Sequence, residues 1–334
     1  MKTSQLSKVA INIIGIIFVL LSIGVSISYG ATNIDLHTVW QSIFQFDADN
    51  QSHNVIRELR IPRALAAVLA GAFLAVSGAI MQGMTRNPLA SPSIMGVTDG
   101  AAFMLVIMLA FFPAVPNIGS TFASFIGAGI AVTLVFLVGS FSSGGLTPVK
   151  LALAGVAIGT LLRSLSSVLA LHFQLEKDIG FWLAGGLDGA GWGSVQMLFV
   201  AGLIGMFLAI TISKSITVLS LGDDLSTGLG QNNTLIKIAG IVVVLILTGA
   251  AVSVAGAVGF IGLIIPHISR FIIGTDYRWI IPASAVFGAL LLVNADLVAR
   301  MINAPFETPV GALTSIIGVP FFLYLARGSG GDSK

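Results

Sequence analysis

The sequence predicts an all-α integral membrane protein with ten transmembrane helices, inverted-repeat-like halves and both termini in the cytoplasm. Three observations support this fold class. Apolar residues make up 56% of the 334 positions and charged residues only 9%, whereas a soluble domain usually carries about a quarter. Apolar stretches of about 18 residues or more recur, each long enough to cross a hydrocarbon core of roughly 30 Å. These stretches are continuous rather than alternating, which indicates helices and excludes a β-barrel.

The first predicted span covers residues 9–29. It follows Lys2 and Lys8 and resembles a signal peptide, but it is long for the apolar region of one, and Ser28-Tyr29-Gly30 is a poor cleavage site. We therefore expect a retained first helix. The other spans are predicted at 61–82, 94–111, 118–139, 151–171, 195–213, 235–257, 258–273, 280–299 and 308–326.

The seventh and eighth spans need a separate argument. From Ile238 to Ser269 the chain carries no Asp, Glu, Lys or Arg. As one helix this run would be roughly 48 Å long at about 1.5 Å per residue, well beyond the thickness of the hydrocarbon core. Residues that favour a turn lie within it, namely Gly256, Gly259, Gly262 and Pro266. We therefore predict two helices here.

The distribution of basic residues tests this division, because Lys and Arg gather on the cytoplasmic side of membrane proteins. Ten spans with an internal N-terminus place ten of the sixteen basic residues inside, whereas nine spans would move four of them out and one other in, leaving seven. Ten spans therefore fit better. The inside set is Lys2, Lys8, Arg86, Lys150, Lys214, Lys237, Arg270, Arg278, Arg327 and Lys334.

The sequence lacks the motifs of common enzyme chemistries. It has no P-loop, no His-Glu-x-x-His and no Gly-x-Ser-x-Gly, and its four histidines are scattered. With no cysteine, disulfide and thiolate chemistry are excluded. We expect no enzymatic activity, no cofactor, no metal site within the chain and no nucleic-acid partner. Energy for uphill movement must then come from an ion gradient or from another subunit.

Charges within the predicted spans are few. Asp99 lies near the start of the third span, Asp296 near the outer end of the ninth, and Arg163 within the fifth. Ion-coupled transporters often place acidic or histidine residues within their spans as relays. Three isolated charges favour such a machine only weakly. It remains an alternative, as does a membrane scaffold without transport activity.

The predicted cytoplasmic loop 214–234 contains a short amphipathic helix. Leucines recur at i, i+4 and i+8 and form one stripe, which consists of Leu221, Leu225 and Leu229. Ser220 with Asp223 gives a cap-like start, and Gly230 is a natural residue after a helix C-terminus. Acidic residues at its start and the lack of a basic face suit an anionic membrane poorly. The stripe therefore favours contact with a cytoplasmic protein.

Arginines also gather on the predicted external side, against the usual trend. Arg57, Arg60 and Arg63 cluster at the entrance to the second span, and Arg300 lies just beyond the ninth. One interpretation is interfacial snorkelling or a local pair with Glu58. The other is docking of an acidic external partner through forked, charge-assisted pairs. The pattern alone does not separate the two.

Several short motifs follow one another in order along nearly the whole chain. They are Arg60-Ile61-Pro62-Arg63, Ser77-Gly78-Ala79 with Met81-Gln82, Arg86-Asn87-Pro88-Leu89-Ala90 with Gly96-Val97, and the segments 221–230, 259–270, 296–300 and 318–322. Together they resemble the permeases of iron-siderophore and cobalamin ABC importers, the FecCD-type family.

The resemblance implies a type II ABC importer permease with a single transmembrane domain over residues 1–334. Two such subunits would form the pore, two cytoplasmic ATPases would dock on it, and an external binding protein would deliver the ligand. In the family, acidic residues of the binding protein meet permease arginines, which correspond here to Arg60, Arg63 and Arg300. The ATPase contact corresponds to Leu221, Gly222, Asp223, Asp224, Leu225, Gly228, Leu229 and Gly230.

The same resemblance indicates a ferric siderophore as cargo, with cobalamin or haem as the alternative, and a multi-pass protein of the bacterial plasma membrane. Whether the second permease subunit is identical or distinct stays open. The fifth and tenth spans line the path in relatives, and Arg163 departs from expectation because it interrupts the apolar fifth span. It is either a snorkelling or helix-pairing arginine, or a pathway residue that attracts an anionic ferric chelate.

Overall fold

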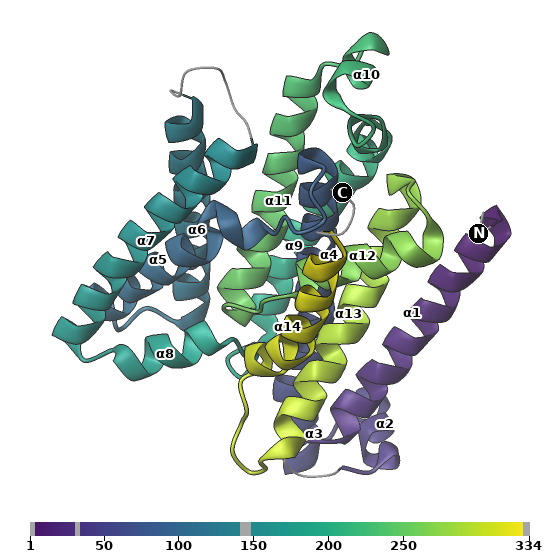
Figure 1. The fold of residues 1–334 in the computed structure, drawn as a ribbon. Coiled ribbons are helices and arrows are strands. Elements are labelled where there is room, and N and C mark those ends of the chain that lie inside the picture. The colour runs from purple at the N-terminus through teal and green to yellow at the C-terminus, as the bar shows by residue number, and fades with distance from the viewer. Residues whose placement is uncertain (1–3, 31–33, 141–147, 330–334) are drawn as a thin grey trace.

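The computed structural model describes residues 4–30, 34–140 and 148–329, and every regular element within these ranges is a helix. Long helices run side by side between two ends of the molecule (Figure 1). One end carries α2 (Leu36–Phe44) and α3 (Gln51–Val55), and the opposite end carries α10 (Asp223–Gly228). Lys2 and Lys334, which the charge distribution assigns to the inside, lie outside the described residues.

A helix occupies each of the ten predicted spans. In the described part of the chain, seven are long and apolar enough to cross a membrane, namely α1 (Gln5–Ser28), α4 (Ile61–Thr85), α6 (Asn117–Ser140), α7 (Pro148–Phe173), α9 (Trp192–Leu219), α11 (Asn233–Ala255) and α13 (Tyr277–Ile302). Three further apolar segments are shorter, namely α5 (Val97–Phe111), α12 (Ile261–Ile273) and the part Val310–Tyr324 of α14 (Val310–Ser329). These fall below the roughly 20 residues of a typical span.

The chain turns between the seventh and eighth predicted spans, because α11 ends at Ala255 and α12 begins at Ile261. Gly256 makes this turn with a φ of 66°, and a Cβ there would collide with the carbonyl oxygen of Trp182. Only glycine meets both demands without strain. Two of the residues considered for the turn, Gly262 and Pro266, instead lie inside α12.

α4 is the central helix of the bundle and packs against α9, α11, α12 and α13. Small residues allow these contacts. A Cβ at Gly78 would collide with the backbone of Gly262 on α12, and one at Gly71 with the backbone of Gly288 on α13. Because lipid offers no hydrophobic driving force between helices, such close packing is a main source of helix association in a membrane.

Several short elements lie outside the predicted spans. A π-helical segment, η1 (Ile56–Arg60), links α3 to α4; a 3₁₀ turn, η2 (Pro92–Met95), precedes α5; and α8 (Glu176–Ala184) follows α7. Ile27, Val39, Ile56 and Ala64 form a small apolar cluster where α1, α2, η1 and α4 meet. This cluster fixes the end of the molecule that carries the predicted external arginines.

Candidate functional site

Asp296 of α13 lies between two arginines at the end of the bundle that carries α2 and α3. Its side chain is fully buried, with Oδ1 2.9 Å from Nη2 of Arg63 and Oδ2 3.1 Å from Nε of Arg300. Arg63 also places Nη1 2.6 Å from Oε1 of Glu307, which follows α13. The structure thus brings two of the three predicted docking arginines together around one buried carboxylate.

Arg60 and Arg300 also bind the C-terminal end of α1. Nη1 of Arg60 donates to the carbonyl oxygens of Ile27 and Ser28 at 2.8 and 3.0 Å. Nη2 of Arg300 donates to the carbonyl oxygen of Ser26 at 3.1 Å and to its hydroxyl at 2.7 Å. The last carbonyls of a helix lack partners within it and carry partial negative charge. Both guanidinium groups therefore cap α1.

Burial limits what these arginines offer to a partner. Arg60 and Arg300 are 8% and 7% exposed, and the side chain of Arg63 is 12% exposed, whereas that of Glu307 is 38% exposed. The exposed member of this ion-pair cluster is therefore an acid. Arg57 lies over the ring of Phe46 at 4.6 Å.

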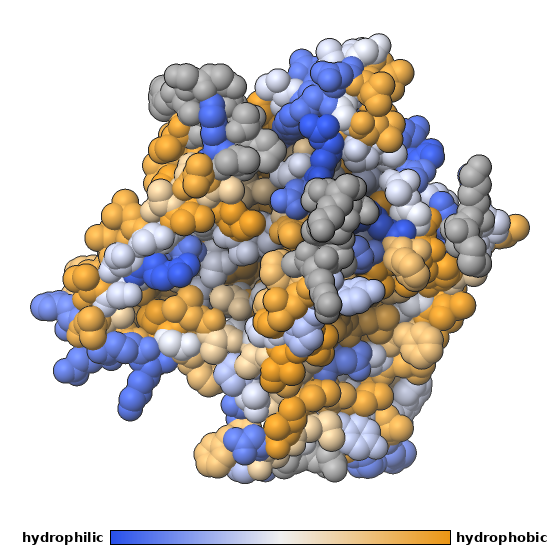
Figure 2. Space-filling view, in the orientation of Figure 1, coloured by the Kyte–Doolittle hydropathy of each residue, from blue (hydrophilic) through white to orange (hydrophobic). Residues whose placement is uncertain are grey.

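A short helix, α10, lies at the opposite end of the molecule where the amphipathic helix was predicted, but it is shorter than the leucine stripe: Leu225 lies within it, and Leu221 and Leu229 flank it. The leucine stripe is exposed, and apolar surface shows over α10 in Figure 2. The predicted start was wrong: the hydroxyl of Ser220 bonds to Thr217 within α9, and α10 begins after Gly222, whose φ is 130°. Gly230 follows the helix with a φ of 81°, as expected of a residue after a helix C-terminus.

Asp223 holds α10 to the bundle. Its Oδ1 lies 3.0 Å from Nζ of Lys237 on α11, and its Oδ2 lies 3.6 Å from Nη2 of Arg86 at the end of α4. Nδ2 of Asn233 donates to the carbonyl oxygen of Asp223 at 3.0 Å. Asp224 and Gly228 are exposed. Of the predicted ATPase-contact residues, Asp223 therefore acts as an internal anchor, while the leucines and Asp224 face outward.

Arg163 of α7 pairs with Asp99 of α5. Its Nε and Nη2 both donate to Oδ1 of Asp99, at 3.0 and 2.8 Å. Asp296 is likewise paired. The three charges that look isolated in the sequence are thus all in ion pairs, because residues distant along the chain meet in the fold.

The sequence analysis did not identify the partners of these charges, nor a partly buried contact between Gln82 and Arg270. Nε2 of Gln82 donates to the carbonyl oxygen of Leu263 at 3.2 Å, and Nη2 of Arg270 donates to its Oε1 at 2.5 Å. Gln82 and Arg270 lie in motifs that carried the family resemblance. The presence of both residues in these motifs is the feature of the sequence that could have suggested the contact.

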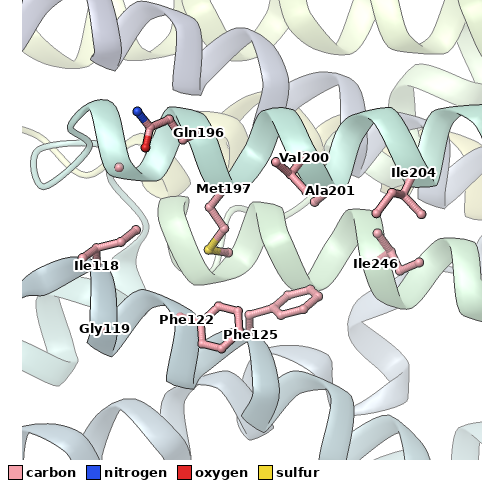
Figure 3. Close-up of a pocket in the computed structure, with 11 residues that line it drawn as sticks. Ile118, Gly119, Phe122, Phe125, Gln196, Met197, Val200, Ala201, Ile204 and Ile246 are labelled. Atoms are coloured by element: carbon pink, nitrogen blue, oxygen red, sulfur yellow. The ribbon is translucent and has the colours of Figure 1, made fainter.

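An open groove of about 610 Å³ lies between α6, α9 and α11. Figure 3 shows Met197, Phe122 and Phe125 pointing toward one another, while the amide of Gln196 points away from them. The groove shares no lining residue with a cavity of about 210 Å³ at Arg163. The wall of the groove between α6, α9 and α11 is apolar and suits hydrocarbon better than a charged cargo.

These features define a polytopic helical membrane protein, with buried ion pairs at one end and an exposed amphipathic helix at the other. In the described part of the chain, no group of three or more His, Asp or Glu residues could hold a metal ion.

Residues 16–328 match the FecCD transport family, and the chain belongs to it. It is 58% identical to the iron(3+)-hydroxamate import system permease protein FhuB of Bacillus subtilis, covering 96% of this chain and 83% of that one. It is 46% identical to the iron-uptake system permease protein FeuB of the same organism, covering 94% of each.

The fold is also similar to a solved structure assigned to the metal-chelate type of ABC transporter, in an inward-facing conformation. The TM-score is 0.83 at 30% identity, covering 96% of this chain and 99% of that one. The chain is therefore a multi-pass transport permease of ABC type in the bacterial cell membrane, and not an enzyme.

Proposed function

We propose that this permease translocates a ferric siderophore within an ABC importer. The observation that carries the proposal is the family match over nearly the whole chain, together with two close relatives that are named for iron(3+)-hydroxamate import and iron uptake. Haem and cobalamin remain the alternative cargoes, since permeases named for hemin and cobalamin transport are 36% and 39% identical to it. ATP hydrolysis belongs to separate subunits.

In this proposal the chain crosses the membrane ten times, with inverted-repeat-like halves and both termini and the loop 214–234 in the cytoplasm. Support comes from the seven long apolar helices and the three shorter ones. The N-terminal end of α1 and the last turns of α14 lie toward the α10 end of the molecule (Figure 1), which agrees with an even number of crossings.

An external binding protein docks at the end that carries Arg60, Arg63 and Arg300. Because these arginines are largely buried in intrachain contacts, docking acids reach Arg63 most readily by displacing Glu307, its most exposed partner. Arg60 and Arg300, which are buried beneath this surface, support it by holding the end of α1.

Two cytoplasmic ATPases dock on α10 and on its counterpart in a second permease subunit, identical or distinct. The exposed leucine stripe supplies the apolar contact. Asp223, tied to Arg86 and Lys237, passes the motion of α10 to α4 and α11. ATP-driven rocking of the helix bundles then opens the pathway to one side at a time.

Reconstitution tests the cargo and the energy source together. The permease, its ATPases and its binding protein in proteoliposomes should take up a labelled ferric trihydroxamate with ATP, and an uncoupler should not stop it. Uptake that collapses with the uncoupler while ATP is held constant would instead favour the ion-coupled alternative. Transport of haem or cobalamin but not of the ferric chelate would identify the alternative cargo.

Co-purification tests the role of α10. Asp224→Lys should release the ATPase subunits, whereas Asp49→Lys, an exposed acid near the opposite end, should leave them bound. An intact complex with Asp224→Lys would contradict the assignment.

A further inference from the structure

A strip of polar side chains interrupts the exposed face of α7. Arg163 stands about 15 residues from the start of this helix and about 10 from its end, so it lies roughly 22 Å and 15 Å from the two ends. Thr160, Ser164 and Ser167 are exposed around it. Figure 2 shows a hydrophilic patch over α7 within an apolar surface. An arginine at this depth is unfavourable against lipid and marks a water-filled path or a partner.

Asp99, packed against Gly159, holds this arginine in place. A Cβ at Gly159 would lie 2.5 Å from Oδ2 of Asp99, so the carboxylate fits against α7 because that position is glycine. Asp99 lies in the first turn of α5, where the helix dipole favours a negative charge. Its side chain is 12% exposed, whereas that of Arg163 is 68% exposed.

The pair leaves part of the guanidinium available. Nε and Nη2 are both used by Oδ1 of Asp99, while Nη1 makes no hydrogen bond within the described residues. The cavity beside it is lined by Arg163, Ser166, Ser167 and Glu176, among others. A guanidinium held by one edge presents its other N–H groups in a fixed direction, a geometry that suits carboxylate and other anionic oxygens.

We propose that Asp99 is a positioning residue that holds Arg163 so that the free edge of its guanidinium meets an anionic oxygen on the cargo chelate. The inference rests on the proposed function: among the ferric chelates that the permease moves, those that carry an exposed anionic oxygen are moved in preference to neutral ones. Because Asp99 offsets the charge of Arg163, the site attracts such a cargo without holding it tightly. A transport path needs this weakness, since a cargo that binds too strongly does not leave.

The experiment compares two cargoes of similar size in the complete importer, with its ATPases and binding protein, in proteoliposomes. One is a neutral ferric trihydroxamate, and the other is the same chelate bearing one free carboxylate. The readout is the ratio of carboxylated to neutral uptake in the wild type and in Asp99→Ala, Arg163→Gln, Arg163→Lys and the double variant Asp99→Ala/Arg163→Gln. Because each variant uses the same binding protein, the preference of that protein for one chelate over the other affects all variants equally.

The ratio should fall by about tenfold or more in Arg163→Gln, the loss expected for one charge-assisted hydrogen bond. Asp99→Ala should also lower it, because a guanidinium that is no longer held in a fixed direction loses more than the added positive charge restores. The double variant should be no worse than Arg163→Gln, since the two residues act as one unit. In Arg163→Lys the ratio should lie between those of the wild type and Arg163→Gln, because lysine keeps the positive charge. If Asp99→Ala does not assemble, Asp99→Asn retains the hydrogen-bond acceptor and should lower the ratio less than Arg163→Gln.

An unchanged ratio in Arg163→Gln would overturn the inference, even if uptake of both chelates fell equally. An unchanged ratio in an assembled Asp99→Ala importer would likewise overturn the positioning role of Asp99. Loss of the second permease subunit from the Arg163→Gln complex would also overturn the inference and would assign Arg163 to the contact between subunits. Failure of the wild-type importer to move either chelate would overturn the proposed function itself, which is a separate result.

Discussion

Removal of the buried carboxylate of Asp296 should strongly destabilise the protein. The side chain is fully buried between Arg63 and Arg300, so Asp296→Ala leaves both guanidinium groups short of a partner. Breaking a buried pair by removing one member typically costs about 3–5 kcal/mol. Glu307 still compensates Arg63 in part, so we expect the lower part of that range, about 3 kcal/mol.

Reversible unfolding in mixed detergent micelles measures this free energy. The matched control is Glu307→Ala, which removes the other carboxylate that binds Arg63. Because Glu307 is 38% exposed, its pair should contribute less than about 1 kcal/mol. Combining Asp296→Ala with Arg63→Met should recover part of the loss, since one of the two unpaired buried cations is then absent. Equal effects of Asp296→Ala and Glu307→Ala would refute the argument from burial.

Three further predictions concern backbone and caps. Gly78→Ala should destabilise the protein by about 1–3 kcal/mol or more, because the new Cβ meets the backbone of Gly262; Gly24→Ala, which meets no atom within 4 Å, should be neutral or stabilising in the same thermal unfolding assay. Gly230→Ala should cost about 1 kcal/mol through its φ of 81° alone, whereas Gly228→Ala, within α10, should not; equal melting temperatures would contradict this. The hydrogen bond from Arg278 lowers the pKa of Asp276, which caps α13. Its contribution to stability is therefore present above the unfolded value near 3.9 and is lost as the pH falls through the lower folded value, so Asp276→Asn should reduce the acid dependence of the melting temperature.

The spans could be predicted because the length and polarity of an apolar run are local properties. Each predicted span corresponds to a helix, and the turn after Ala255 lies where the glycines indicate it. Short elements were missed because α2 and α8 have nine residues each, too few for a clear periodic signal. The start of α10 was misplaced because Ser220 bonds backward into α9 instead of forward.

The pairing of charges could not be predicted, because it depends on which helices meet. Arg63 and Asp296 are 233 positions apart, and Asp99 and Arg163 are 64 apart. The excess of external arginines did indicate an exception that needed a reason. The groups that these arginines bind, namely the buried acid and the carbonyls at the end of α1, can be seen only in the fold.

The central position of α4 has a consequence for biosynthesis. Its partners α9, α11, α12 and α13 all follow it in the chain, and the first of them begins at Trp192, more than a hundred residues after α4 ends at Thr85. A nascent chain therefore inserts its future centre early and exposes the glycine faces of α4 to lipid until the C-terminal half emerges. A chain interrupted before α9 would leave that helix without its neighbours, a form that membrane quality-control proteases could recognise.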